Sequence, residues 1–166
     1  VNVAIWLILE VIGVMVFGER NATVNGQFML LFGAKYNALI SAGEWWRLLS
    51  AAFLHFGLFH LLMNSFSLYQ LGPQIERLFG RGRFLAIYLL AGLYGNLFSY
   101  LFSTSLAAGA SGAIFGLLGA FIAYLRRYRT VSYTHLRAHE TVLDLVCRLL
   151  LEQKKSQLLY VAPYIT

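Results

Sequence analysis

A single hydroxyl group stands in an otherwise apolar stretch about two thirds of the way along the chain. Ser111 lies in the run Gly109–Gly112, where an apolar helix is expected to begin. A serine in this setting can act as a nucleophile toward a carbonyl carbon. It can also be one of the small residues through which membrane helices pack closely. Gly112, Gly116 and Ala120 recur every four residues, which favours a packing role for the glycines. The short motif alone therefore does not decide whether Ser111 is a nucleophile or a packing residue.

His60 and Asn64 favour the interpretation of Ser111 as a nucleophile over its interpretation as a packing residue. They are four residues apart, so they share one face of a helix, and polar groups inside a membrane must pair or line a cavity. They can simply bond one helix to another. Yet a serine nucleophile needs hydrogen-bond donors aimed at the oxygen on which negative charge develops. With the backbone N–H of Ser111 at a helix N-terminus, the pair predicts acyl transfer inside a membrane.

The composition is that of a membrane protein. Of the 166 residues, 59% are hydrophobic and 12% are charged, against about 25% charged residues in soluble domains. The net charge of +6 does not indicate nucleic-acid binding, because arginines gather in two clusters at the ends of apolar runs. The clusters are Arg77, Arg81 and Arg83, then Arg126, Arg127 and Arg129. The single cysteine, Cys147, excludes an internal disulfide.

Four apolar segments are expected to cross the bilayer as helices: Val1–Phe17, Leu58–Phe79, Phe84–Phe102 and Gly112–Tyr128. The first is slightly short for a hydrocarbon core, which favours further residues upstream. Glu10 lies in its middle, and we expect this side chain to be structural, buried or reaching the interface, rather than catalytic. The predicted fold class is an all-α membrane protein, a polytopic helical bundle.

The third segment carries a stripe of small residues on one face: Ala91, Gly95, Ser99 and Ser103. Such a face can approach another helix closely. The two arginine clusters follow the second and fourth segments, so the positive-inside rule places both clusters in the cytoplasm. The 18–57 loop and Ser111 then lie toward the outer surface, level with the start of the second segment.

The segment Gly18–Leu49 is too interrupted by glycine, asparagine and charged residues to span a membrane. Trp45 and Trp46 near its end are typical of a membrane interface. We therefore expect the loop to lie partly in the headgroup region. Arg47 is expected to donate hydrogen bonds to carbonyl groups of the same loop.

Several motifs, in order along Asn2–Arg129, resemble the rhomboid intramembrane serine proteases. They are Trp46-Arg47, His55, His60 with Asn64, Glu76, and Gly109-Ala110-Ser111-Gly112. The resemblance implies the first four helices of a rhomboid-like six-helix core. It also implies transmembrane protein substrates in a lipid bilayer, no metal or other cofactor, and a multi-pass protein of a bacterial cell membrane.

The resemblance also implies roles for single residues. Ser111 would be the nucleophile, within the motif glycines Gly109 and Gly112. His60 and Asn64 would serve the oxyanion hole. The remaining matches would be structural: Trp46 and Arg47 in a membrane-embedded loop, and Glu76 at the cytoplasmic end of the second helix. Phe115 departs from a tyrosine that many relatives carry.

The catalytic base is unknown. The resemblance implies a histidine from a sixth helix, but the histidines after Ser111 are His135 and His139, and no apolar helix of membrane length surrounds them. Residues 1–130 are therefore expected to form a partial membrane domain. The tail, 131–166, resembles at its start a translated sequencing adapter, and we expect it to form no domain. The alternative for the tail is an amphipathic cytoplasmic helix.

The favoured hypothesis is an intramembrane serine protease that cleaves transmembrane substrates near their outer ends. The 166-residue chain itself is expected to be inactive, because loss of one member of a serine–base pair costs several powers of ten in rate. The alternative is a rhomboid-like pseudoprotease that binds membrane clients without cleaving them. A channel or transporter fragment is a weaker third hypothesis, for which Glu10 is the candidate residue.

Overall fold

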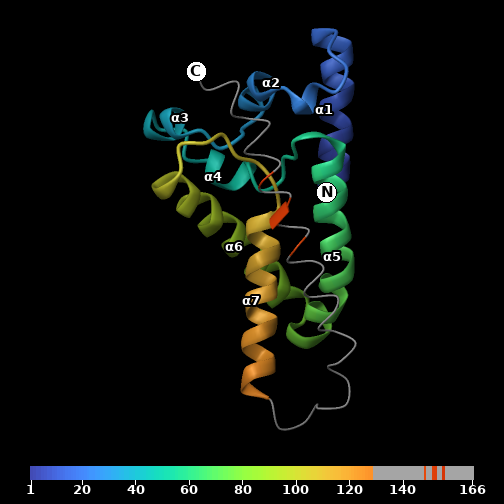
Figure 1. Ribbon diagram of the computed structural model, residues 1–166, viewed down its shortest axis with the longest axis vertical. Coiled ribbons are helices and arrows are strands. Elements are labelled where there is room, and N and C mark those ends of the chain that lie inside the picture. Colours follow the sequence, from blue (N-terminus) through green and yellow to red (C-terminus); the bar gives the residue numbers. More distant parts are fainter. Residues whose placement is uncertain (129–147, 149–150, 153–154, 156–166) are drawn as a thin grey trace.

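The computed structural model describes residues 1–128, 148, 151–152 and 155, and the regular elements of 1–128 are helices (Figure 1). In chain order they are α1 (Asn2–Phe17), the 3-10 helix η1 (Ala22–Val24), α2 (Gly26–Leu31), α3 (Asn37–Ser41), α4 (Arg47–Ser50), α5 (Gly57–Phe79), α6 (Arg81–Phe102) and α7 (Ser111–Arg127). The all-α prediction is confirmed for this part of the chain. The largest difference from the four predicted segments is at α6, which begins at Arg81 rather than Phe84.

Helices α5 and α7 run in the same direction and end at the same end of the molecule, with α6 returning between those two in the chain (Figure 1). Gly80 makes the reversal from α5 to α6 tight, because its φ of 77° belongs to a region that favours glycine. Its N–H donates to the carbonyl of Glu76 (2.8 Å), and its own carbonyl accepts from the N–H of Phe84 (3.0 Å). One residue thus ends α5 and begins α6.

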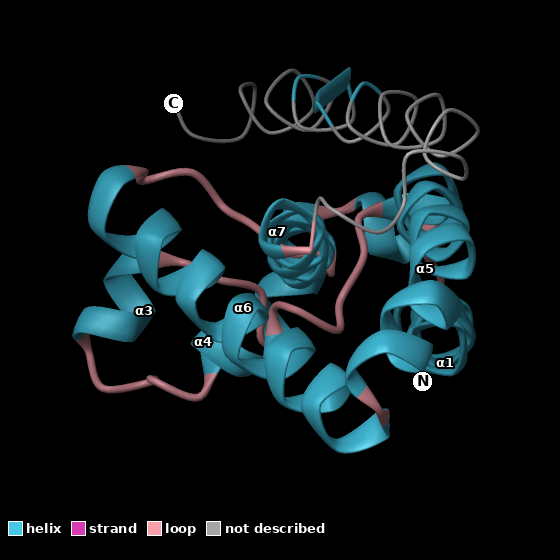
Figure 2. Ribbon diagram, turned by 90° about the horizontal axis from the view of Figure 1, so that it is seen from below, coloured by secondary structure: helices cyan, strands magenta, loops and turns pink. Residues whose placement is uncertain are grey.

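Small residues let α6 and α7 approach backbone to backbone. A β-carbon added at Gly95 would lie 3.2 Å from Cα of Gly112, and one added at Gly116 would overlap the side chain of Ala91. The predicted close-approach face of the third segment is therefore confirmed at Ala91 and Gly95. Figure 2, a view along the helices, shows α7 beside α6, with α5 on the other side of α7.

The apolar core divides into two clusters of buried side chains. One lies among α5, α6 and α7 and is built from Leu71, Ile75, Tyr88, Ala110, Ala113, Ile114, Leu117, Leu118 and Phe121. The other joins α1 to η1, α2 and the segment before α7, through Leu9, Ala22, Phe28, Met29, Ala34, Leu54 and Ala108. The segment that enters α7 touches both clusters, so its position depends on every long helix.

The segment between α1 and α5 has no helix long enough to span a membrane, as predicted, but it contains several short helices. Residues 18–57 contain η1 and the short helices α2, α3 and α4. Glu10 of α1 faces this region and accepts hydrogen bonds from the backbone N–H (3.2 Å) and the hydroxyl of Thr23. Glu10 is therefore a structural residue, as expected, because its carboxylate fixes the start of the loop.

By length and composition, α6 is the one helix of the described residues that is long and apolar enough to cross a membrane. Helix α1 is apolar but shorter. Large apolar side chains nonetheless lie exposed on all the long helices, for example Met15 on α1, Phe59 on α5 and Phe98 on α6. A lipid surface accounts for them, since soluble monomers rarely expose large contiguous apolar patches. The predicted tail, 131–166, lies outside the described residues apart from 148, 151–152 and 155.

Candidate active site

The turn before α7 presents Ser111 at the first residue of that helix. Gly109 has a φ of 137°, which a residue with a β-carbon rarely adopts, and its N–H donates to the carbonyl of Ala51 (2.8 Å). Ala110 follows as the N-cap residue and is fully buried. Ser111 is partly exposed and makes no hydrogen bond through its hydroxyl within the described residues. The turn therefore holds a serine at a helix N-terminus, where the helix dipole favours negative charge.

His60 and Asn64 lie against this turn. A β-carbon at Gly109 would lie 2.5 Å from Cε1 and 2.6 Å from Nε2 of His60, and 3.6 Å from Nδ2 of Asn64. Both side chains are buried, at 3% and 2% exposure. Only glycine leaves room for the imidazole ring at this point, so Gly109 is needed for space as well as for its backbone conformation. The structure thus brings together the two polar residues of α5 and the turn that carries Ser111.

The Asn64 side chain is held in place by its own helix. Nδ2 donates to the carbonyl of His60 (3.2 Å), and Oδ1 is buried without a hydrogen-bond partner among the described residues. An amide nitrogen has two N–H groups, so one remains for another acceptor near Gly109. This arrangement can stabilise negative charge on an oxygen in the space beside the turn.

His55 touches the same turn from the other side. Its ring is 99% buried, lies 5.2 Å from the ring of His60, and is placed by Nδ1 against the Phe53 carbonyl (3.3 Å). Nε2 faces the backbone N–H of Ala110 at 3.5 Å. Burial lowers the pKa of His55 to about 4, opposed by the Phe53 hydrogen bond. The neutral ring therefore offers Nε2 as the acceptor for the Ala110 N–H.

Arg47 organises the loop beside the site, as predicted. Its guanidinium donates to the carbonyls of Leu30 (2.7 Å) and Ala34 (3.1 Å) and forms an ion pair with Glu44 (2.6 Å). The ring of Trp46 is half-exposed and stacks on the same guanidinium, with 4.8 Å from Cζ to the ring centroid. The contacts of both residues thus lie within the loop, away from Ser111.

Glu76 and Gly112 contact other helices rather than the polar side chains at the turn. Glu76 pairs with Arg81 across the α5–α6 reversal, with 3.0 Å between Oε1 and Nε. Gly112 is a packing residue against Gly95 of α6. Both positions therefore serve the helix arrangement, at the far end of α5 and at the start of α7.

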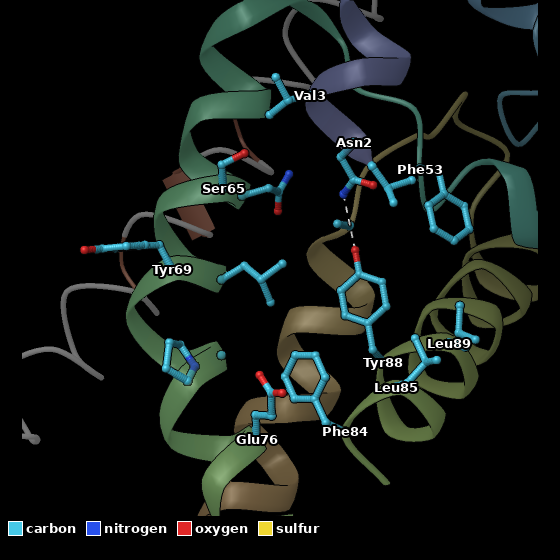
Figure 3. A pocket seen from close by; sticks show the side chains of 16 residues that line it. Asn2, Val3, Phe53, Ser65, Tyr69, Glu76, Phe84, Leu85, Tyr88 and Leu89 are labelled. Atoms are coloured by element: carbon cyan, nitrogen blue, oxygen red, sulfur yellow. Dashed lines mark hydrogen bonds between the residues drawn. The ribbon is translucent and has the colours of Figure 1, made fainter. Parts of the chain in front are cut away.

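A cavity of about 520 Å³ opens behind the site, between α1, α5 and α6 (Figure 3). Asn64 and Ala110 form part of its wall, and Ser65, Tyr69 and Glu76 line it along α5. Across the cavity, Nδ2 of Asn2 donates to the hydroxyl of Tyr88 (3.3 Å), the dashed line in Figure 3. Asn64 therefore borders both the cavity and Gly109.

The sequence of the chain matches the rhomboid domain family over residues 42–152. The chain belongs to the rhomboid family. The matched region contains Trp46 and Arg47, and all the polar residues described at the turn: His55, His60, Asn64 and Ser111.

Several named rhomboid proteins are similar to this rhomboid chain. Rhomboid protease GluP of Bacillus subtilis (strain 168) is 44% identical over 118 residues, which are 71% of this chain and 23% of that protein. RHOMBOID-like protein 9, chloroplastic, of Arabidopsis thaliana is 41% identical over 117 residues, 67% of this chain and 27% of that protein. Rhomboid-like protease 1 of Toxoplasma gondii is 46% identical over 90 residues, 53% of this chain and 31% of that protein. The chain thus spans about a quarter to a third of the length of these relatives.

The described part of this rhomboid chain contains two histidines, His55 and His60, both buried on the α5 side of the turn. The two further histidines, His135 and His139, lie outside the described residues. No group of three or more metal-ligating side chains occurs in the described residues. The site as described supplies a hydroxyl and hydrogen-bond donors, and the catalytic base remains unknown.

Two residues at the site have roles that the sequence did not predict. His55 belongs to the rhomboid motif without a predicted contact, and Lys35, whose ammonium group donates to the carbonyls of Ser103 and Ser105, matches no motif. The only sequence feature that sets Lys35 apart is a charge between two apolar stretches, in the segment 28–40. Its partners lie almost seventy residues away in sequence, beyond the reach of any local pattern.

Proposed function

We propose that this rhomboid protein is an intramembrane serine protease that cleaves transmembrane protein substrates near their outer ends. The observation that carries the proposal is the contact between His60 and Gly109, which brings the donors of α5 to the turn bearing Ser111. The family and the names of the relatives support proteolysis. The identity of the nucleophile is our inference from the site.

In the proposed reaction, Oγ of Ser111 attacks the carbonyl carbon of a substrate peptide bond, and its proton passes to a base outside the described residues. The backbone N–H of Ser111, Nδ2 of Asn64 and the ring of His60 donate to the oxygen that becomes negative. When the resulting tetrahedral intermediate collapses, its C–N bond breaks, the leaving amine takes the proton from the base, and an acyl-enzyme remains on Ser111. Water then hydrolyses that ester and restores the hydroxyl.

We further propose that the protein crosses the membrane several times, with the turn bearing Ser111 toward the outer surface. The arginines at the ends of α5 and α7 support this orientation. Localisation to a bacterial cell membrane remains part of the proposal. No metal or organic cofactor is needed, because each step uses side chains, backbone N–H groups and water.

The test compares wild type with Ser111→Ala in a gene product that continues past α7, on a reporter whose transmembrane segment is cleaved in membranes. Loss of the nucleophile should reduce cleavage by about a thousandfold or more. Ser67→Ala is the matched control, because the Ser67 hydroxyl bonds only the carbonyl of Met63 on its own helix (2.9 Å). Equal cleavage by wild type and Ser111→Ala would refute the assignment of the nucleophile.

The same assay separates the protease from the pseudoprotease hypothesis. Reporter binding without cleavage by the extended gene product would favour a client-binding protein. The 166-residue chain is expected to give no cleavage, which measurement of both lengths in parallel would check.

A further inference from the structure

Lys35 is a fully buried cation in the loop between α2 and α3. Its side chain has 0% exposure, and it forms no ion pair with any acidic residue that the structure describes. Its ammonium group instead donates to two backbone carbonyls, those of Ser103 (2.7 Å) and Ser105 (3.1 Å). A lysine is almost never fully buried unless its charge is satisfied. These two bonds are therefore the reason that the charge can remain inside.

The backbone of Lys35 binds the same segment. Its N–H donates to the carbonyl of Ala107 (2.8 Å), and its carbonyl accepts from the N–H of Ala107 (3.1 Å), which makes an isolated antiparallel bridge. One loop residue thus fixes three positions, Ser103, Ser105 and Ala107, in the link 103–110 between α6 and α7. Any residue type can form the backbone bridge to Ala107. What the lysine side chain adds is the two hydrogen bonds to Ser103 and Ser105, which lie nearer to α6.

The link ends at the candidate site. After Ala107 come Gly109, whose backbone lies against the ring of His60, and then Ser111. The far end of the link is held by the Ala51 carbonyl at Gly109. The near end is held by Lys35 together with α6, because the N–H of Ser103 donates to the Ser99 carbonyl (2.9 Å) and Lys35 also reaches the carbonyl of Ser105. A displacement of about 1 Å in reacting groups can cost on the order of a hundredfold in rate, so the fixing of both ends bears on catalysis.

Burial of Lys35 costs free energy, because its charge is removed from water. Desolvation lowers the pKa of its ammonium group to about 8. A residue that only filled space here would be better apolar, because an apolar side chain carries no desolvation penalty. The retained charge therefore has a use that packing alone does not explain.

We propose that Lys35 is a positioning residue, whose buried ammonium group holds the carbonyls of Ser103 and Ser105 and thereby sets the link that carries Gly109 and Ser111 against His60 and Asn64. This inference rests on the proposed proteolytic function for its catalytic part. Its structural part, the tether of the link, stands on the contacts alone.

The variant for the test is Lys35→Met, which keeps the length of the side chain and removes its donors. Asn37→Ala is the matched control, because Asn37 lies two residues further on, at the start of α3, and donates to the carbonyl of Tyr100 in α6 (2.9 Å) rather than to the link. The first measurement is amide hydrogen exchange of the 166-residue chain in bilayer nanodiscs. Lys35→Met should lose protection at the amides of Ala107 and Gly109, and Asn37→Ala should keep it.

The second measurement is cleavage kinetics in the gene product extended past α7. We expect kcat of Lys35→Met to fall by about ten- to a hundredfold with KM within about twofold of wild type. Asn37→Ala should retain kcat. A variant that merely destabilised the protein would lower the active fraction, so kcat is normalised to the folded fraction measured by size-exclusion chromatography.

Unchanged exchange at Ala107 and Gly109 in Lys35→Met would overturn the tether. Lost protection with unchanged kcat would overturn its catalytic part. Absence of cleavage in wild type would contradict the proposed function instead, with the exchange result still deciding the tether. If Lys35→Met does not fold, Lys35→Gln takes its place in both measurements, because its shorter side chain is neutral and reaches the two carbonyls less well. Exchange at Ala107 and Gly109 equal to that of wild type would then overturn the inference.

Discussion

At the scale of single residues, the region around the site is held by buried polar side chains that donate to backbone carbonyls. Arg47 binds Leu30 and Ala34, Lys35 binds the link before α7, and Asn96 donates to Leu48 (2.9 Å). Each of these bonds joins segments far apart in sequence. A non-helical segment inside a membrane protein has to satisfy its carbonyls in this way, because lipid offers no donors.

Replacement of Arg47 by methionine should be strongly destabilising. It would leave the carbonyls of Leu30 and Ala34 without their donor and Glu44 without its ion pair, and each buried unsatisfied acceptor costs about 1–3 kcal/mol. We expect a loss of about 2–4 kcal/mol in reversible unfolding by SDS. Arg81→Met is the control, because its pair with Glu76 is solvent-exposed and such pairs contribute little. Similar losses in the two variants would contradict this account.

The neutral state of His55 predicts a loss of stability in acid. Its pKa is about 4 in the folded protein and 6.5 as the ordinary value, so between these pH values the unfolded chain binds more protons. The contribution of His55 to the free energy of unfolding should therefore be constant above pH 6.5 and decrease as pH falls toward 4. Protonation would also replace the acceptor for the Ala110 N–H with a donor.

The measurement is the difference in unfolding free energy between wild type and His55→Gln, which cannot titrate in this range. This difference should favour wild type most at pH 7.5 and shrink by pH 4.5. A difference that does not vary with pH would show that His55 is not held neutral by the fold.

At the scale of elements, glycine decides how closely α6 and α7 approach. Gly116→Ala should be destabilising, because its β-carbon would overlap Ala91 and force the helices apart. Gly119→Ala lies on the same helix with nothing within 4 Å of the added carbon. It should be neutral or more stable by about 0.5–1 kcal/mol, from helix propensity alone. Gly116→Ala should therefore lower the unfolding midpoint in SDS and Gly119→Ala should not, and equal losses in the two variants would refute the packing model.

The elements were predictable where the signal is periodic and local. Segment 58–79 differs from α5 by one residue at its start, and the stripe through Ala91 and Gly95 correctly predicted a close helix contact. The short helices α2, α3 and α4 were missed, because segments of four to six residues are too short to show a helical apolar period. At the site, the motif residues were found from spacing. Lys35 was not, because its acceptors are backbone atoms, which leave no trace in residue type.

At the scale of the whole molecule, the direction of the helices and the arginines agree. The carboxyl ends of α5 and α7 lie at one end of the molecule, and the start of α7 lies toward the loop that carries α2, α3 and α4 (Figure 1). Arg77 and Arg81 lie at the end of the molecule where α5 finishes. Arg126 and Arg127 are the last two residues of α7 and lie at the same end. A membrane with one positive-rich side would therefore meet both clusters together.

Single cysteines give the test of that orientation, with Cys147 replaced by serine. Ala42, Gly82 and Tyr128 are exposed positions, in the loop, at the α5–α6 reversal and just after α7. In intact bacterial cells an impermeant maleimide should label Ala42→Cys, and should label Gly82→Cys and Tyr128→Cys only after the membrane is opened. The reason is that α5 and α7 run the same way, so their ends must share a side. Labelling of Gly82→Cys and Tyr128→Cys from opposite sides would exclude the multi-pass arrangement on which an outward-facing Ser111 depends.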